Sequence, residues 1–139
     1  LDDLVPLLSG YLDFYEVAAP HAKIREFLGA RVGSGQSTVF IARSVDGVAV
    51  GFVQLYPFFA SLALQASWLV SDLYVLPAAR RDGYGEALMN AARAHGESTG
   101  ACGLMLETAK TNHAGQSLYE RLGYKRDDKF YTYWLDLTA

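Results

Sequence analysis

The most informative segment of the chain reads Arg80-Arg81-Asp82-Gly83-Tyr84-Gly85-Glu86-Ala87-Leu88. It follows a β-rich run that Pro77 stops, and it opens a stretch whose apolar residues recur at helical spacing. Glycine at positions 83 and 85 lets the backbone approach an anion closely and lets several amide N–H groups point into one concavity. The helix start adds its positive dipole end, and two arginines can pair with phosphate oxygens. The segment therefore predicts a pyrophosphate-binding loop.

Two other phosphate-binding loops do not fit this segment. The dinucleotide-binding fingerprint has a third glycine where this chain has Leu88, and it places its glycines directly after the strand, without two arginines. The Walker loop ends in Gly-Lys followed by Ser or Thr, which the segment lacks. The alternative that stays open is a glycine-rich turn with solvent-exposed arginines.

Outward from this loop, hydrophobic periodicity and turn residues divide the chain into helices and strands. Asp2 or Asp3 is expected to cap the first helix, Asp46-Gly47 to turn a hairpin, and Gly123 to end the last helix. Residues 58–66 show no clear pattern and are expected to be an irregular connection. The expected helices are 4–15, 20–32, 83–95 and 113–122, and the expected strands are 38–42, 48–56, 68–76, 104–108 and 130–137. The strand–helix–strand unit around the loop implies a parallel pair inside a mixed sheet.

Composition limits the class of protein. The chain has 139 residues, of which 51% are hydrophobic and 19% charged, so it can bury the core of one domain and is not intrinsically disordered. A net charge of -3 gives no general attraction to nucleic acid or to an anionic membrane, and we expect neither as a partner. One cysteine and dispersed histidines predict no disulfide and no metal site. With no leader or spanning segment in the sequence, we expect a cytoplasmic protein.

Two blocks of residues resemble those of the GNAT N-acetyltransferase superfamily. Arg80-x-x-Gly83-x-Gly85, after the strand at 72–75 and Pro77, resembles its acyl-CoA-binding motif. Downstream, Leu106-Glu107-Thr108, Asn112, Ala114 and Leu118-Tyr119-Glu120-Arg121-Leu122-Gly123-Tyr124 is similar to the family's Asn-x-x-Ala…Leu-Tyr-Glu-x-x-Gly-Phe/Tyr segment. The resemblance covers residues 38–137, and it is nearest to small bacterial members and to the fungal histone/polyamine-type branch.

The resemblance implies an α/β fold. A central mixed, mostly antiparallel sheet with a splayed parallel strand pair would be flanked by roughly four helices. Residues 1–139 would form a single GNAT domain. The family normally begins with another strand, and no strand is evident before Leu4, so this domain is expected to lack the first strand at its N-terminus.

The resemblance also implies acetyl-CoA as co-substrate, without a metal, and assigns residues to it. The backbone of the splayed strand would bind the pantetheine arm, the loop amides would hold the pyrophosphate, and an asparagine would contact the pantetheine arm or the neighbouring strand. The residues so assigned are Leu73, Tyr74, Val75, Arg80, Arg81, Asp82, Gly83, Tyr84, Gly85, Glu86 and Asn112.

The implied reaction is direct attack of an amine on the thioester. Tyr119 matches the family tyrosine that protonates the leaving thiolate, and a phenol with an ordinary pKa of about 10 suits that role. Glu107, at a strand end, is the candidate general base, and Asp72 is the alternative. Polyamine-acetylating relatives tend to carry Glu where this chain has Ser71, which argues against a polyamine acceptor.

The acceptor could be an antibiotic, a polyamine, an amino-acid derivative or a peptide, and the sequence does not choose. Asp13 and Glu16 could attract a cationic amine, although a solvated helix face explains them as well. Candidate pocket aromatics, for which core burial is the ordinary role, are Tyr11, Phe14, Tyr15, Tyr56, Phe58, Phe59, Trp68, Tyr131 and Tyr133.

Two further expectations concern assembly and activity. Residues 130–134 are strongly β-prone and could pair with another chain, so a homodimer is expected. The alternative to an enzyme is a non-catalytic acyl-CoA-binding or regulatory domain with the same fold, since fold alone does not fix function.

Overall fold

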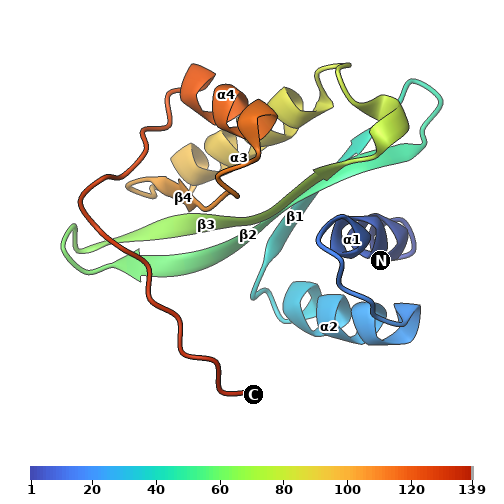
Figure 1. Cartoon of the computed structure of the whole chain (residues 1–139), viewed down its shortest axis with the longest axis horizontal. Helices are drawn as coiled ribbons and strands as arrows, with labels where there is room; N and C mark the ends of the chain where they lie inside the picture. Colours follow the sequence, from blue (N-terminus) through green and yellow to red (C-terminus); the bar gives the residue numbers. More distant parts are fainter. Residues whose placement is uncertain (139) are drawn as a thin grey trace. The chain divides into compact units, whose positions relative to one another are not determined.

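The computed structural model describes residues 1–138 (Figure 1). Contacts divide the chain into two compact units, residues 1–107 and the residues from Thr108 onward, which are described separately. The first unit contains α1 (Leu4–Phe14), α2 (His21–Gly33), β1 (Thr38–Arg43), β2 (Ala49–Ala60), β3 (Gln65–Val75), a short 3-10 helix (Pro77–Ala79), α3 (Tyr84–Ser98) and β4 (Leu104–Leu106). The second unit contains α4 (His113–Arg121). No helix within residues 1–138 is long and apolar enough to cross a membrane.

The first unit is built on a four-stranded sheet in the order β1-β2-β3-β4. β1 and β2 are antiparallel, β2 and β3 are antiparallel, and β3 and β4 are parallel. α1 and α2 lie on one side of the sheet, and α3 lies on the other, where it contacts the first three strands (Figure 1). The expected α/β class, with a mixed and mostly antiparallel sheet, is confirmed.

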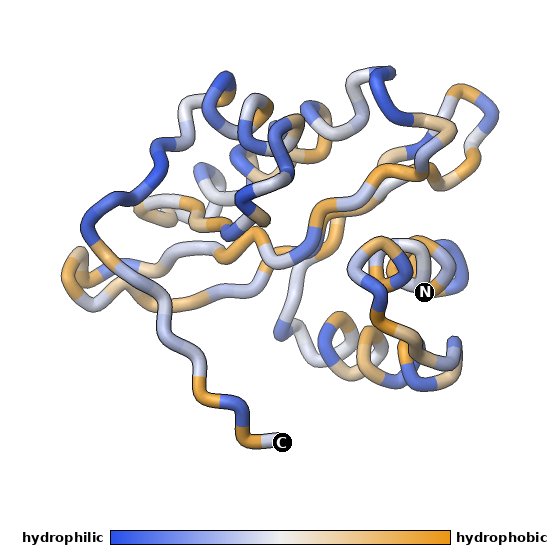
Figure 2. The backbone as a smooth tube through the Cα atoms, in the orientation of Figure 1, coloured by the Kyte–Doolittle hydropathy of each residue, from blue (hydrophilic) through white to orange (hydrophobic). Residues whose placement is uncertain are grey.

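Two hydrophobic layers hold these helices to the sheet. On the α1 side, the cluster joins Leu4, Leu8, Leu28, Phe52 and Tyr74, and all of them are 9% exposed or less. On the opposite side, α3 contributes the buried side chains of Leu88, Met89 and Ala92. Hydrophobic residues run along β2, β3 and the α1–α2 pair, whereas the loop before α3 is hydrophilic (Figure 2).

The prediction of an irregular connection over residues 58–66 is wrong, because β2 continues to Ala60 and β3 begins at Gln65. Pro57 lies inside this hairpin, opposite Trp68. The Trp68 N–H bonds the carbonyl of Gly103 on the far side of β3, so the pair does not exchange hydrogen bonds. The missing N–H of Pro57 therefore removes no hydrogen bond between β2 and β3. On the other edge of β2, β1 begins at Thr38 opposite Leu55 and does not extend as far as Pro57.

The prediction of a strand over residues 130–137 is also wrong, because the structure gives this segment no strand. Tyr131 and Trp134 are 89% and 88% exposed. β-propensity mostly reflects packing against neighbouring strands, so an alternating aromatic sequence does not form a strand without a partner.

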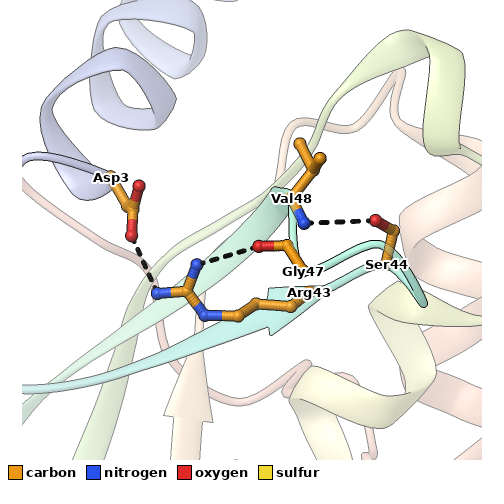
Figure 3. Close-up of polar contacts among 5 residues, drawn as sticks. All are labelled: Asp3, Arg43, Ser44, Gly47 and Val48. Carbon is orange, nitrogen blue, oxygen red and sulfur yellow. Dashed lines mark hydrogen bonds and ion pairs between the residues drawn. The ribbon is translucent and has the colours of Figure 1, made fainter.

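The start of α1 is held by ion pairs rather than by a side-chain cap. Neither predicted cap forms, because Asp3 occupies the cap position without a capping hydrogen bond. Its carboxylate instead accepts from Arg43 Nη2 at 2.8 Å, and Arg43 Nη1 donates to the carbonyl of Gly47 (Figure 3). The Val48 N–H donates to Ser44 Oγ in the same turn. Asp2 pairs with Arg25 on α2 at 2.8 Å. These contacts connect α1 to β1 and to α2.

Candidate active site

The strands that pair with β3 differ between its first and second halves. β4 pairs with Trp68, Leu69 and Val70, and within residues 1–138 no strand pairs with the outer edge of residues 71–75, whereas β2 pairs with the inner edge of residues 72–75. The change coincides with a register shift, because Gln54 faces Asp72 whereas Leu55 faces Val70. Ser71 is therefore the additional residue of a bulge. The parallel pair separates where this bulge lies, which gives the splayed pair that was expected.

The direction of each backbone group on this free edge follows from the pairing. The Leu76 N–H bonds the carbonyl of Val50 at 2.8 Å, which makes that pair a hydrogen-bonded one. Since such pairs alternate along an antiparallel ladder, Tyr74 also directs its N–H toward β2. Leu73 and Val75 direct theirs to the free edge. The carbonyl of Val75 confirms this direction, because it accepts from Arg80 Nε at 3.0 Å.

The loop before α3 brings together the predicted phosphate-binding residues from Arg80 to Glu86. Arg81 and Gly83 both have left-handed backbone angles, with φ of 71° and 85°, and Gly83 is the cap residue of α3. Arg80, directly before them, is extended, so the chain turns sharply into the helix start, a place that suits an anion. A Cβ at Gly83 would meet nothing within 4 Å, so glycine is favoured there by its φ alone. The first N–H groups of α3 have no carbonyl partner within the helix.

Arg80 sits between this loop and the free edge. Its guanidinium lies 5.7 Å from the centre of the Phe14 ring and 5.8 Å from that of Tyr74. Together with the bond to Val75, these contacts fix the side chain across the end of β3 and α1. A guanidinium has five N–H donors, so the remaining donors stay available for an anion.

A polar cluster lies on the α1 side of the same half-strand. Asp72 accepts a hydrogen bond from Gln54 Nε2 at 2.8 Å, and both residues belong to the facing strands β2 and β3. Burial, followed by the negative charge of Asp72, raises the pKa of the Tyr11 phenol. The same two causes raise the pKa of Tyr56, against an opposing effect of Arg31. Both phenols therefore remain protonated at neutral pH.

The other candidate carboxylate, Glu107, directly follows β4 and is exposed to solvent. Among the residues that the structure describes, no group of three or more His, Cys, Asp or Glu side chains could hold a metal ion.

The second unit holds the remaining two predicted site residues. Asn112 caps α4, since its Oδ1 accepts from the Gly115 N–H at 3.1 Å, and its Nδ2 donates to Thr108 Oγ1 at 3.0 Å. Tyr119 is partly buried, and its ring centre lies 6.1 Å from that of Tyr124. α4 ends as predicted at Gly123, whose φ is 98°. The Tyr124 N–H bonds the carbonyl of Tyr119, and the Gly123 N–H bonds that of Glu120, which is a Schellman motif.

Sequence reasoning missed Gln54. It is 1% exposed in the middle of β2, with Leu and Val side chains on either side in the chain. A glutamine inside an otherwise apolar strand was the available signal, because buried polar side chains require partners.

A mixed sheet whose parallel pair separates beside a helix start is the arrangement that the resemblance implied for an acyltransferase of the GNAT class. The family comparison agrees, because the model of the acetyltransferase (GNAT) family matches residues 4–124. The chain belongs to this family and is an acetyltransferase.

Three similar proteins fit this assignment. "Uncharacterized N-acetyltransferase YhfO" of Bacillus subtilis (strain 168) is 37% identical over 98% of this chain and 91% of its own. "Aminoglycoside N(6')-acetyltransferase type 1" of Klebsiella aerogenes is 33% identical over 74% of this chain and 68% of its own. The crystal structure of a probable acetyltransferase, 32% identical, superposes with a TM-score of 0.92 over 99% of this chain and 92% of that chain.

Proposed function

We propose that this protein transfers an acetyl group from acetyl-CoA directly to a primary amine of a small molecule or peptide. The observation that carries the proposal is the free edge of β3 beside the loop before α3. Leu73 and Val75 offer backbone groups to an extended pantetheine arm, and the residues from Arg81 to Glu86 offer amides to a pyrophosphate. Arg80 adds positive charge, and the family resemblance adds Asn112 as a further contact.

The proposed reaction needs three things from the chain. The amine nitrogen attacks the thioester carbonyl carbon, and the carbon–sulfur bond breaks as the new carbon–nitrogen bond is completed. A backbone N–H at Leu73 or Val75 stabilises the oxyanion. The proton that the amine loses passes to Glu107, with Asp72 as the alternative, and the leaving thiolate takes a proton from Tyr119. The role of Tyr119 rests on the family motif.

The acceptor that we propose is a cationic amine of the aminoglycoside kind or a related small amine. The support is the Klebsiella aerogenes relative, which is named for an aminoglycoside, together with the uncompensated carboxylate of Asp72 on the α1 side of β3. Ser71, where polyamine-acetylating relatives tend to carry Glu, argues against a polyamine.

Calorimetric titration with acetyl-CoA tests the cofactor half of the proposal. The wild-type protein should bind, and Gly85→Glu should abolish binding, because a carboxylate would project beside the amides that hold the pyrophosphate. Gly33→Glu is the matched control, since it adds the same charge at the end of α2, where a Cβ meets nothing within 4 Å. Absence of binding at millimolar acetyl-CoA, or equal loss in both variants, would contradict the proposal.

Release of free thiol with a panel of amines tests the transfer itself. Tyr119→Phe should lower the maximal rate while acetyl-CoA binding survives, because only the proton donor is removed. Equal rates in the two forms would exclude the acid role of Tyr119.

We further propose a cytoplasmic homodimer. The support for the dimer is the exposed aromatic segment at 130–134, in which Phe130, Tyr131 and Trp134 are 75%, 89% and 88% exposed. Sedimentation equilibrium should give the mass of two chains, and replacing Tyr131 and Trp134 by serine should give one. The reducing cytoplasm suits the single free Cys102.

A further inference from the structure

Phe14, the last residue of α1, is a large aromatic side chain that core packing does not explain. It is 58% exposed, and the hydrophobic cluster that residues 1–138 form on the α1 side of the sheet does not include it. Its ring lies edge-on to that of Tyr15, with centres 5.1 Å apart, and the guanidinium of Arg80 lies over it. The second contact connects the end of α1 to the loop before α3.

Three contacts hold the side chain of Arg80. Its guanidinium lies 5.7 Å from the centre of the Phe14 ring and 5.8 Å from that of Tyr74, and its Nε donates to the carbonyl of Val75 at 3.0 Å. Tyr74 is 9% exposed and packs against Tyr11, so the core fixes that ring. Phe14 is the exposed ring of the two, and its removal should loosen Arg80 without opening the core.

These contacts leave the two terminal NH₂ groups of Arg80 available to a ligand. The bond to Val75 uses the Nε–H, and the rings attract the positive charge without using an N–H. Among residues 1–138, the ion pairs do not include Arg80, and its side-chain hydrogen bond is the one from Nε. Terminal guanidinium nitrogens form a planar fork that matches two oxygens of a phosphate. Arg80 is therefore held in place while its phosphate-binding donors stay free.

We infer that Phe14 is a positioning residue for acetyl-CoA, because its ring holds the Arg80 guanidinium where the pyrophosphate would meet it. Ordering a long side chain during binding costs free energy, and a side chain that is ordered beforehand avoids this cost. Arg81, the other arginine of the loop, has no such ring contact within residues 1–138. The inference rests on the proposed function, since acetyl-CoA is the proposed source of the pyrophosphate.

Calorimetry with acetyl-CoA tests the role of the ring. Phe14→Leu keeps an apolar side chain of similar size but removes the ring, so binding should weaken about two- to tenfold. Phe14→Tyr keeps a ring and should bind like the wild type. Phe27→Leu is the matched control, because Phe27 is a 44% exposed ring on α2 with Arg31 at 5.3 Å from its centre. It loses the same kind of contact and should leave acetyl-CoA affinity unchanged.

Two further measurements distinguish positioning from a general effect on the fold. In an Arg80→Gln background, Phe14→Leu should weaken acetyl-CoA binding no further, because the residue through which Phe14 acts is gone. With an amine that supports thiol release, Phe14→Leu should raise the KM for acetyl-CoA and leave kcat at saturation unchanged. A raised KM for the amine alone would instead make Phe14 an acceptor contact and overturn the inference.

The same titrations separate this inference from the proposed function. If the wild-type protein does not bind acetyl-CoA at millimolar concentration, the proposed function is wrong and the inference falls with it. If the wild type binds and Phe14→Leu binds as tightly, or Phe27→Leu loses as much, the inference alone is wrong. Failure of Phe14→Tyr to keep the affinity, or an additive loss in the Arg80→Gln background, would also overturn it.

Discussion

The two halves of β3 differ in their pairing with neighbouring strands. Residues 68–70 lie between β2 and β4, whereas residues 72–75 have β2 as their one strand partner within residues 1–138. One extra residue, Ser71, separates them. In the doubly paired half, the backbone N–H and C=O groups form hydrogen bonds with the neighbouring strands. The outward-facing groups of Leu73 and Val75 have no strand partner in the described part of the chain, and we propose that they bind a ligand. The difference teaches that a local change of pairing opens the edge that we propose as the acetyl-CoA site.

Truncation of the core beneath each half should give the largest effects. Phe52 faces Tyr74 in the open half, Leu55 faces Val70 in the closed half, and both are 0% exposed. Phe52→Ala should lower the free energy of unfolding by about 3–5 kcal/mol, and Leu55→Ala by about 2–5 kcal/mol, because each leaves a cavity. Urea denaturation measures both values.

The affinity of the same two variants for acetyl-CoA tests whether the two halves of β3 differ in function. Calorimetry measures this affinity at a temperature where both variants are folded. Phe52→Ala should weaken binding, because Phe52 supports Tyr74, which lies between the two residues that we propose to face the ligand. Leu55→Ala should leave binding near the wild-type value. Equal weakening by both variants would mean that the two halves are not functionally distinct.

Gly51 of β2 leaves no room for a side chain beside the open half of β3. A Cβ there would lie 2.8 Å from the backbone oxygen of Tyr74 and 3.2 Å from Val75 Cγ2, so one strand would have to move. Gly51→Ala should therefore lower the free energy of unfolding by about 1–3 kcal/mol and weaken acetyl-CoA binding. Gly103→Ala, where a Cβ meets nothing within 4 Å, is the control and should change neither quantity.

A single backbone atom can also be tested. Replacement of the Leu73 amide by an ester removes an N–H that faces the free edge, and the same replacement at Tyr74 removes one that faces β2. The Leu73 ester should lower kcat/KM by about tenfold, with little change in melting temperature. The Tyr74 ester should cost about 1 kcal/mol of stability and spare kcat/KM. The reverse pattern would show that the alternation of N–H directions has been assigned wrongly.

The sequence predicted this architecture well where the signal was local. The helices, the hairpin at Gly47 and the end of α4 at Gly123 follow from periodicity and from glycine conformations that need no distant partner. The turn at Gly83 was predictable for the same reason, because glycine adopts a positive φ without strain. Phosphate binding by this loop stays a prediction.

The sequence failed where structure depends on distant partners. Residues 58–60 become strand because β3 returns alongside them, and residues 130–137 do not, since β-rich sequence needs a neighbour. The polar cluster was missed for the same reason. Gln54 and Asp72 are far apart in the chain, and only the register of β2 and β3 places them opposite one another.

The smallest expected effect concerns the anchor of α1, the helix that covers the open half of β3. Asp3→Asn breaks the ion pair between Asp3 and Arg43, whose side chains are 53% and 47% exposed, respectively. The free energy of unfolding should therefore fall by about 0.2–1 kcal/mol, and the effect should shrink in high salt. Asp2→Asn, which breaks the pair with Arg25, is the control, and its 93% exposed carboxylate should matter less. Thermal melts at low and high salt measure both. Because the Asp3 pair ties α1 to β1 whereas the Asp2 pair ties it to α2, a larger loss in Asp2→Asn would show that α2 rather than the sheet fixes α1 above Tyr74.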